Sequence, residues 1–126
     1  MTWPVEYTDE FGAWWDTLNE EERIRVTASV GLLERHGPNL RVPHSRGISG
    51  SRHGHLRELR VQIGGRPIRV FYAFDPRRTA ILLIAGDKTG QNDFYVRMIP
   101  IADRLYDEHL AEIAAEAEKK EAPDGS

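Results

Sequence analysis

The sequence contains no cysteine, which excludes disulfide bonds, thiolate metal ligands and a thiol nucleophile. It also lacks an apolar run near the roughly 20 residues that a membrane-spanning helix needs. Residues 1–5 show neither the basic start nor the apolar segment that is typical of a secretory signal peptide. These absences indicate a reducing compartment, so we expect a cytoplasmic protein that does not associate with membranes.

The formal net charge is only −3, but the charges are distributed unevenly along the chain. Residues 1–34 carry a net charge of −6 and residues 105–126 a net charge of −5, whereas residues 35–104 carry a net charge of +8. Twelve of the thirteen bases in this middle segment are arginine, which binds phosphate oxygens in pairs and stacks on nucleobases. A basic middle between acidic ends favours a polyanionic partner, although arginines also decorate ordinary solvated surfaces.

The first third of the chain carries helix start and stop signals. Residues 3–7 are short and β-prone, which predicts a first strand. Thr8 has the character of a helix N-cap, and Asn19 with Glu22 resembles a capping box for a second helix. Gly37 is followed by proline, a combination that ends helices. These signals predict a strand followed by a two-helix hairpin.

The middle and last thirds predict a sheet and a final helix. Residues 38–54 are rich in glycine, proline and serine, which predicts a loop. Residues 55–63 and 67–74 alternate between apolar and polar, and residues 79–85 form a continuous apolar run. We therefore expect two half-buried strands and one central strand. Pro100 is a favoured first residue of a helix, so we expect the last helix to begin there.

With 126 residues, 40% of them hydrophobic, the chain is long enough for one domain with a modest core. We expect this domain over residues 1–117, followed by a polar C-terminal tail over residues 118–126. The fold class is α+β: a short N-terminal strand, a two-helix hairpin, a mostly antiparallel four-stranded sheet and a C-terminal helix.

Two arginines are predicted to face each other across the hairpin of residues 55–74. If the two-glycine turn pairs Ile63 with Arg66, then Arg60 lies opposite Arg69 on the same face. Like charges in this position destabilise a sheet unless an anion or a carboxylate lies between them. One interpretation is a clamp in which both guanidiniums converge on a concave patch and hold an RNA phosphate. The other is a structural network in which Glu58, on the same face, supplies the carboxylate.

Other candidate residues for chemistry surround this pair in the sequence. Lys88 follows the apolar strand and could place a point charge at a phosphate, or it could simply be solvated. Tyr95 could stack on a base or pack in the core. His53 and His55 could transfer protons near neutral pH. These two could also bind a metal, but no further ligand stands at a suitable spacing, so we expect neither a metal nor a cofactor. The remaining candidates for RNA contact are Arg46, Arg52, His55 and Arg57.

Several stretches in a fixed order carry a resemblance to a known family. They are Leu-Arg-Glu-Leu-Arg at 56–60, Ile-Arg-Val-Phe-Tyr at 68–72, Leu-Leu-Ile at 82–84, Lys88, Phe-Tyr at 94–95, and Ile-Pro-Ile-Ala-Asp-Arg-Leu-Tyr at 99–106. Their succession resembles the RelE/HigB toxins of bacterial type II toxin–antitoxin pairs, and more closely the branch first noticed as phage-derived proteins. The resemblance covers nearly the whole chain, and no single stretch is diagnostic.

The resemblance implies a ribosome-dependent endoribonuclease that cuts messenger RNA by metal-free attack of the ribose 2′-hydroxyl, and so stops translation. It implies a hetero-oligomer with an antitoxin that carries a helix-turn-helix domain. By position, Arg60 and Arg69 match the family's strand arginines and Lys88 matches the base after its last long strand. Tyr95 and His53 match an aromatic patch and a histidine less closely. No residue stands out as the general base.

Two other functions are compatible with the same sequence. A gyrase-directed toxin of the ParE type would share the fold without being a nuclease. An inert domain would bind only its antitoxin. The arginine pair and Lys88 favour the nuclease.

Overall fold

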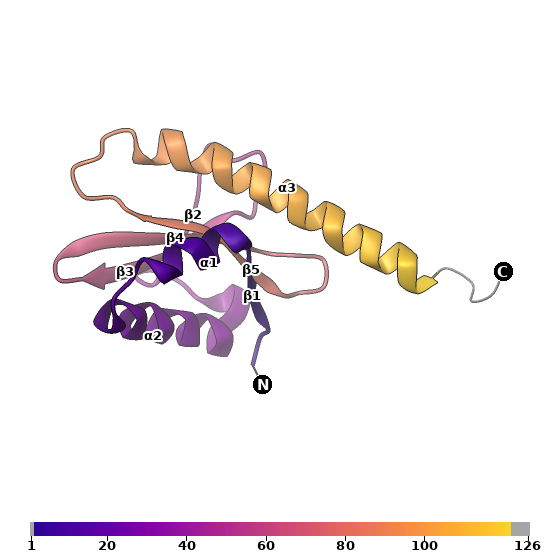
Figure 1. Ribbon diagram of the computed structural model, residues 1–126, viewed down its shortest axis with the longest axis horizontal. Helices are drawn as coiled ribbons and strands as arrows, with labels where there is room; N and C mark the ends of the chain where they lie inside the picture. Colours follow the sequence, from indigo (N-terminus) through magenta and orange to yellow (C-terminus); the bar gives the residue numbers. More distant parts are fainter. Residues whose placement is uncertain (1, 122–126) are drawn as a thin grey trace.

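The computed structural model describes residues 2–121 as a single five-stranded sheet with helices on both faces (Figure 1). Across the sheet the strands are β1 (Val5–Tyr7), β5 (Ala80–Asp87), β4 (Arg66–Phe74), β3 (Arg57–Ile63) and β2 (Ser45–Gly47). β1 runs parallel to β5, and the other neighbouring pairs are antiparallel. The predicted α+β class and mostly antiparallel sheet are confirmed, but the sheet has five strands where we expected four.

The predicted helical hairpin is formed by α1 (Asp9–Asp16) and α2 (Glu20–His36), and both helices start at the predicted caps. The Thr8 side chain accepts a hydrogen bond from the first turn of α1. The Asn19 side chain accepts from the Glu22 N–H at 2.8 Å, and the Glu22 carboxylate accepts from the Asn19 N–H at 2.9 Å. These caps satisfy N–H groups that a helix start otherwise leaves without partners.

The hairpin of β3 and β4 has the predicted register. Residues 64–65 are glycines with φ of 56° and 81°, a conformation that side chains with a Cβ disfavour. This two-residue turn pairs Ile63 with Arg66 and places Arg60 directly opposite Arg69. The turn therefore determines which side chains of the two strands share a face.

The strand β2 corrects the prediction that residues 38–54 form only a loop, because Ser45 pairs with Leu59 and Gly47 with Arg57. A short 3₁₀ helix at Gly37–Asn39 lies at the start of the same segment. Three residues, serine, arginine and glycine, show no alternation and little β-propensity, so the sequence carried no strand signal. This edge strand forms because the backbone N–H and C=O groups on the outer edge of β3 would otherwise have no strand to pair with.

The last helix, α3 (Phe94–Glu121), begins earlier than the predicted start at Pro100. Proline inside a helix removes one N–H and so leaves the carbonyl four residues earlier, that of Val96, without its helical donor. Val96 is 77% exposed, and water can therefore bind this carbonyl. The helix also includes residues 118–121, which we expected in the polar tail; residues 122–126 of that tail lie outside the described residues.

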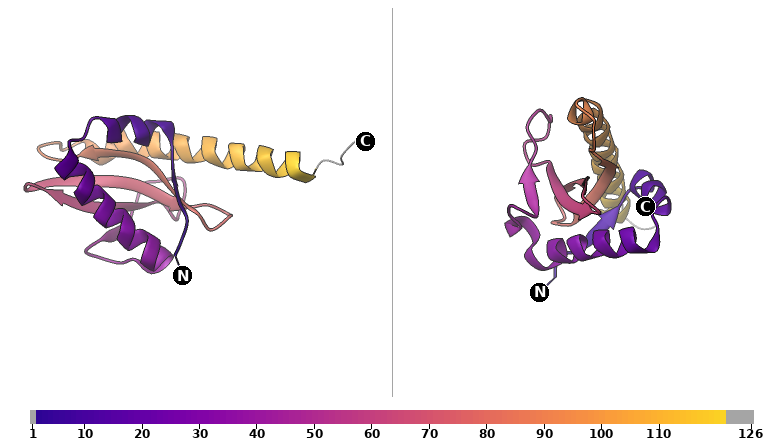
Figure 2. Two further views of the ribbon diagram at one scale, coloured as in Figure 1. Left: turned by 60° about the horizontal axis from the view of Figure 1, so that its bottom comes forward. Right: turned by 90° about the vertical axis from the view of Figure 1, so that its left-hand side faces the viewer.

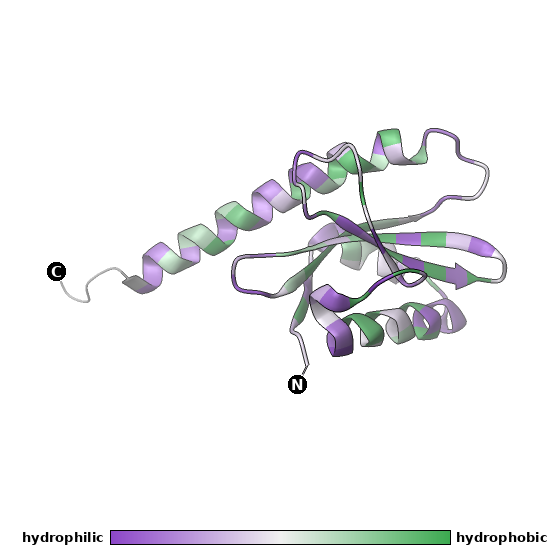
Figure 3. Cartoon of the chain, turned by 180° about the vertical axis from the view of Figure 1, so that it is seen from behind, coloured by the Kyte–Doolittle hydropathy of each residue, from purple (hydrophilic) through white to green (hydrophobic). Residues whose placement is uncertain are grey.

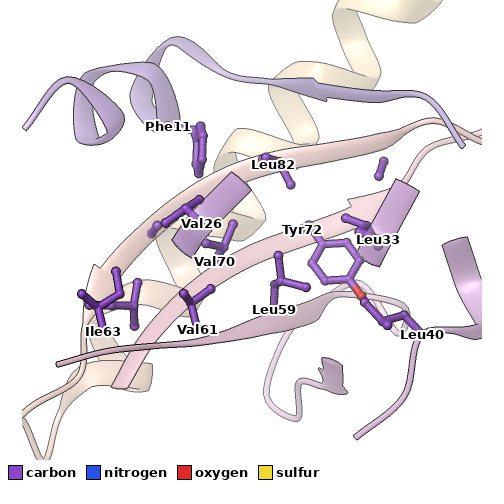
Figure 4. Packing of buried hydrophobic residues seen from close by; sticks show 13 residues of the cluster. Phe11, Val26, Leu33, Leu40, Leu59, Val61, Ile63, Val70, Tyr72 and Leu82 are labelled. Atoms are coloured by element: carbon purple, nitrogen blue, oxygen red, sulfur yellow. The ribbon is translucent and has the colours of Figure 1, made fainter. Parts of the chain in front are cut away.

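The sheet lies between the α1–α2 hairpin on one face and α3 on the other (Figure 2), and it separates two apolar cores. On one face, Phe11 of α1 and Val26 and Leu33 of α2 pack on apolar side chains of β3, β4 and β5 (Figure 4). On the other face, Phe71 and Leu83 pack against the first half of α3. Hydrophobic and hydrophilic residues alternate over residues 59–63 of β3, whereas residues 70–73 of β4 are continuously buried, as expected where both faces of the sheet are covered (Figure 3).

The far half of α3 projects beyond the sheet (Figure 1). Despite the length of α3, no helix within residues 2–121 is apolar enough over a sufficient length to cross a membrane.

A buried ionic network connects the β4–β5 turn to α3 and β1. The buried Asp75 carboxylate accepts hydrogen bonds from His109 Nε2 at 2.8 Å and Arg77 Nη2 at 2.7 Å. Arg77 also binds the Glu6 carboxylate of β1 at 2.8 Å. Burial alone would raise the pKa of Asp75, but hydrogen bonds from Arg77, His109 and the Thr79 and Arg77 backbone outweigh it and hold the pKa below the ordinary 3.8.

This depressed pKa predicts a pH dependence of stability. We expect Asp75→Asn to lower the free energy of unfolding at neutral pH by about 2 kcal/mol, because hydrogen bonds to charged groups each contribute roughly 1.5–3 kcal/mol. The stabilisation is complete well above the unfolded-state pKa and is lost as pH falls through the lower folded-state pKa. In urea unfolding, the difference between the two proteins should therefore shrink below about pH 4. Asp16→Asn, which changes an exposed carboxylate, is the matched control. A difference that does not vary with pH would contradict this account.

Candidate nucleic-acid interface

Four charged side chains share the face of the sheet on which α3 lies. Arg46 of β2 is opposite Glu58 of β3, and Arg60 of β3 is opposite Arg69 of β4. Glu58 is also opposite Phe71, whose ring packs in the core beneath α3, which identifies the face. Because directly paired residues project to the same side of a sheet, these four groups lie together. The predicted convergence of Arg60 and Arg69 on one face is confirmed.

The two arginines differ in exposure, and this difference contradicts the prediction that both of them hold an RNA phosphate. Arg69 is only 4% exposed, and its Nε lies 3.8 Å from Glu58 Oε1, whereas Arg60 is partly exposed. Nη1 of Arg69 donates to the Ile68 carbonyl at 3.1 Å, and Nε has no hydrogen-bond partner among the described residues. Arg69 cannot reach an RNA phosphate from this position. The structure thus favours the second interpretation, in which Glu58 supplies a carboxylate that pairs with Arg69 within the sheet.

The first turn of α3 and the loop before it complete the surface. The Tyr95 hydroxyl donates to Glu58 Oε2 at 2.6 Å. The Lys88 N–H donates to the Pro67 carbonyl at 3.0 Å, which fixes the loop, and Lys88 Nζ lies 5.2 Å from the centroid of the Tyr95 ring. Burial raises the pKa of Tyr95, and the Glu58 carboxylate raises it further, so the phenol holds its proton at neutral pH.

We call the group of Arg46, Arg60, Lys88 and Tyr95, with Glu58 and Arg69 beneath it, the α3-side patch. Its surface members are partly or fully exposed. Two surface hollows of about 290 and 720 Å³ lie along α1, and neither is lined by a member of the patch. The patch therefore lies apart from both of these hollows.

The histidines and Arg52 lie elsewhere. His53 Nε2 is 2.8 Å from Asp107 Oδ1, and Arg52 Nη2 binds the same carboxylate at 2.5 Å. His55 Nε2 is 2.9 Å from the Tyr106 hydroxyl. Asp107 is about 18 Å along α3 from Tyr95, at ~1.5 Å per residue. The structure therefore does not bring His53, His55 or Arg52 to the α3-side patch; these contacts attach the β2–β3 loop to α3.

Arg57 is also separate from the patch. It is one residue from Glu58 in β3, and its side chain consequently projects to the α1–α2 face of the sheet. There its Nε donates to the buried Ser45 hydroxyl at 2.9 Å, and Nη2 lies 3.4 Å from the Leu40 carbonyl. We expected Arg57 to contact RNA together with Arg46, but the two side chains lie on opposite faces of the sheet.

Glu58 is the member of the site that sequence reasoning undervalued. It was predicted only as a possible counter-ion, yet it joins Arg69 and Tyr95 in one buried group. The signal that could have shown this is its alternation with Arg60 on a face that also carries the apolar Phe71. That combination indicates a covered face and hence a buried carboxylate. Within residues 2–121, His, Asp and Glu side chains form no cluster of three or more suited to a metal ion.

The architecture resembles solved structures of RelE. A chain of the RelE–RelB complex from Pyrococcus horikoshii OT3 superposes with a TM-score of 0.53 at 18% identity, covering 71% of this chain and 99% of that one. A mutant of the Escherichia coli toxin RelE in the free state gives a TM-score of 0.54 at 9% identity, covering 75% and 92%. At these identities the likeness shows the fold alone. By its fold, the protein is therefore a RelE-like α+β domain.

Sequence relatives make the assignment more specific. Residues 13–107 match the family described as phage-derived Gp49-like proteins. Two Mycobacterium tuberculosis proteins named as candidate toxins, HigB2 and HigB3, are each 40% identical to this chain, over 106 and 99 residues. The alignments cover 82% and 78% of this chain, and 53% and 85% of the relatives, so the chain spans about half the length of HigB2. The chain belongs to the Gp49-like family, within the RelE/HigB group.

Proposed function

We propose that this protein is the toxin of a type II toxin–antitoxin pair and that it cleaves messenger RNA on the ribosome. The α3-side patch is where the RNA backbone would bind. Arg60 and Lys88 supply positive charge for phosphoryl oxygens, and the Tyr95 ring can stack on a base. The single observation that carries this proposal is the placement of these three side chains around one buried carboxylate on the α3 side of the sheet.

The reaction follows from these groups. The ribose 2′-hydroxyl attacks the adjacent phosphorus, and charge builds up on the phosphoryl oxygens. Arg60 and Lys88 stabilise that charge where it develops, which is the condition for electrostatic catalysis. Because Arg60, Lys88 and Tyr95 are partly exposed at the surface, the ribosome would hold the messenger against them in the reactive geometry. The proposal uses only side chains of this chain and does not use His53, His55, Arg52 or Arg57.

The partner in the proposal is an antitoxin with a helix-turn-helix domain, bound in a hetero-oligomer. The solved RelE neighbour from Pyrococcus is a complex with RelB, which supports such a partnership. An antitoxin that covers the α3-side patch, or that prevents ribosome entry, would neutralise the toxin.

The experiment compares purified variants in a cell-free translation reaction programmed with one messenger. Primer extension should map new 5′ ends with the wild-type protein. Arg60→Ala/Lys88→Ala should lower the cleavage rate by about 10²-fold or more, because single stabilising groups contribute roughly 10²–10³. The matched control, Arg25→Ala/Arg35→Ala, removes the same charge from exposed positions of α2 and should cleave normally.

Two results would overturn the proposal. An intact messenger with the wild-type protein, together with DNA-damage signalling in cells that express it, would favour the gyrase-directed alternative. Equal loss of cleavage in both double variants would show that overall charge matters and not the α3-side patch.

A further inference from the structure

The buried Glu58 carboxylate is poorly explained as a source of stability. Glu58 is 4% exposed, and its ion pair with Arg69 is long, with 3.8 Å between Oε1 and Nε. That nitrogen forms no hydrogen bond with any residue that the structure describes. Removing two charges from water is costly, and a buried pair offsets this cost only with excellent geometry, which is not seen here. Buried acids that are kept at such cost beside a reactive surface are candidates for proton chemistry.

Tyr95 connects this carboxylate to the surface. Its hydroxyl donates to Glu58 Oε2 at 2.6 Å, while its ring is partly exposed and lies beside Lys88. A phenol that already donates its only proton can still accept a hydrogen bond through its oxygen lone pairs. A ribose hydroxyl bound at the patch can therefore donate to Tyr95 but not accept from it. This polarity is the one required for removing a proton from the hydroxyl.

We propose that Tyr95 and Glu58 together form the proton acceptor for the attacking 2′-hydroxyl, an inference that rests on the proposed function. The O–H bond of the 2′-hydroxyl breaks, and its proton passes to the Tyr95 oxygen as the Tyr95 proton passes to Glu58 Oε2. The 2′-oxygen forms a bond to phosphorus, and the bond from phosphorus to the 5′-oxygen breaks. Lys88 donates a proton to the leaving 5′-oxygen. Glu58 ends protonated and Lys88 neutral, and exchange with water restores both.

The charges around Glu58 fit this role. It is faced by Arg46 from β2, Arg69 from β4, Tyr95 from α3 and the partly exposed pair Arg60 and Lys88. Arg69 lies beneath the pair, where its positive charge stabilises the negative charge that develops on the Tyr95 oxygen as the proton moves. In this scheme Tyr95 is the catalytic residue that contacts substrate, and Arg69 is a positioning residue.

The experiment measures single-turnover cleavage of a ribosome-bound messenger at saturating protein. Glu58→Gln and Tyr95→Phe should each slow cleavage by about 10²-fold or more, because positioned acid–base groups contribute roughly 10²–10⁴. Glu58→Asp, which keeps a carboxylate at this position, should recover part of the rate. Ribosome affinity should not change. Glu112→Gln, an exposed change far along α3, is the control.

The outcomes separate the two proposals. If the wild-type protein cleaves and Tyr95→Phe, which keeps the ring and its packing, cleaves at the same rate, the proton relay is wrong while the proposed function stands. A Glu58→Gln protein that cleaves at the wild-type rate would also overturn the relay. If the wild-type protein does not cleave at all, the proposed function itself fails. Thermal unfolding of each variant shows whether a loss of rate reflects a loss of fold.

Discussion

Arg69→Ala should lower the free energy of unfolding by about 3–5 kcal/mol, one of the largest effects of any single change in this protein. Arg69 is the buried partner of the Glu58 carboxylate, and it is 4% exposed. Removing one member of a buried ion pair leaves the other charge uncompensated, which costs roughly this much. A domain of this size has a total stability of only about 5–15 kcal/mol. Urea unfolding at neutral pH measures the difference.

A double variant provides the control for this prediction. Glu58→Gln/Arg69→Met replaces both charges with neutral side chains, and the introduced amide oxygen can still accept the hydrogen bond from Tyr95. We expect this variant to recover most of the lost stability, because neutral replacements of buried pairs are often harmless. An Arg69→Ala protein as stable as the wild type would contradict the buried pair. The same prediction means that loss of toxicity in Arg69→Ala alone does not identify a phosphate contact.

Phe71→Ala should have a comparable effect for a different reason. Phe71 is fully buried in β4, and its ring centroid lies 5.9 Å from that of Phe94 and 6.1 Å from that of Tyr95. It therefore joins the sheet to the first turn of α3. Truncating a buried phenylalanine removes its transfer free energy and leaves a cavity, at a cost of about 3–5 kcal/mol. Urea unfolding measures this change as well.

The matched control for Phe71→Ala is Val96→Ala, two residues beyond Phe94 on the outer side of the same helix turn. Val96 is 77% exposed, so its truncation should change stability by less than about 0.5 kcal/mol. Near-equal effects at these two positions would mean that α3 does not pack on the sheet as described. Phe71→Leu, which keeps most of the volume, should lie between the two.

Much of the architecture was predictable because it depends on contacts that are local in the sequence. The capping box of Asn19 and Glu22 joins residues three apart. The opposition of Arg60 and Arg69 follows from a two-residue turn. In each case the residues that determine the structure are close enough along the chain for a short pattern to describe them.

Elements that depend on distant partners were not predictable in this way. β2 is a strand only because β3 lies beside it, and Ser45–Gly47 has no strand pattern of its own. The predicted start of α3 was wrong because proline is typical of the first turn of a helix. Pro100 is instead tolerated inside α3, where the exposure of Val96 lets water bind the carbonyl that lacks a donor.

The sequence predicts which face of the sheet carries the site, but it does not predict how deeply each side chain is buried. Alternation placed Arg60, Arg69 and Glu58 together, but which of them are buried depends on where α3 crosses the sheet. His53 was separated from the site by its contact with Asp107, 54 residues away. Arg57 was misassigned because its basic character says nothing about which side of the strand it occupies.

The parallel pairing of β1 with β5 has a consequence for synthesis of the protein. Thr8, directly after β1, donates its hydroxyl proton to the carbonyl of Leu83 in β5 at 2.6 Å, across a separation of 75 residues. The first strand to leave the ribosome therefore has no edge to join until Ala80–Asp87 has also emerged. Until then the apolar side of α1 lacks the strand on which it packs, and a nascent chain interrupted before that point exposes a surface prone to aggregation.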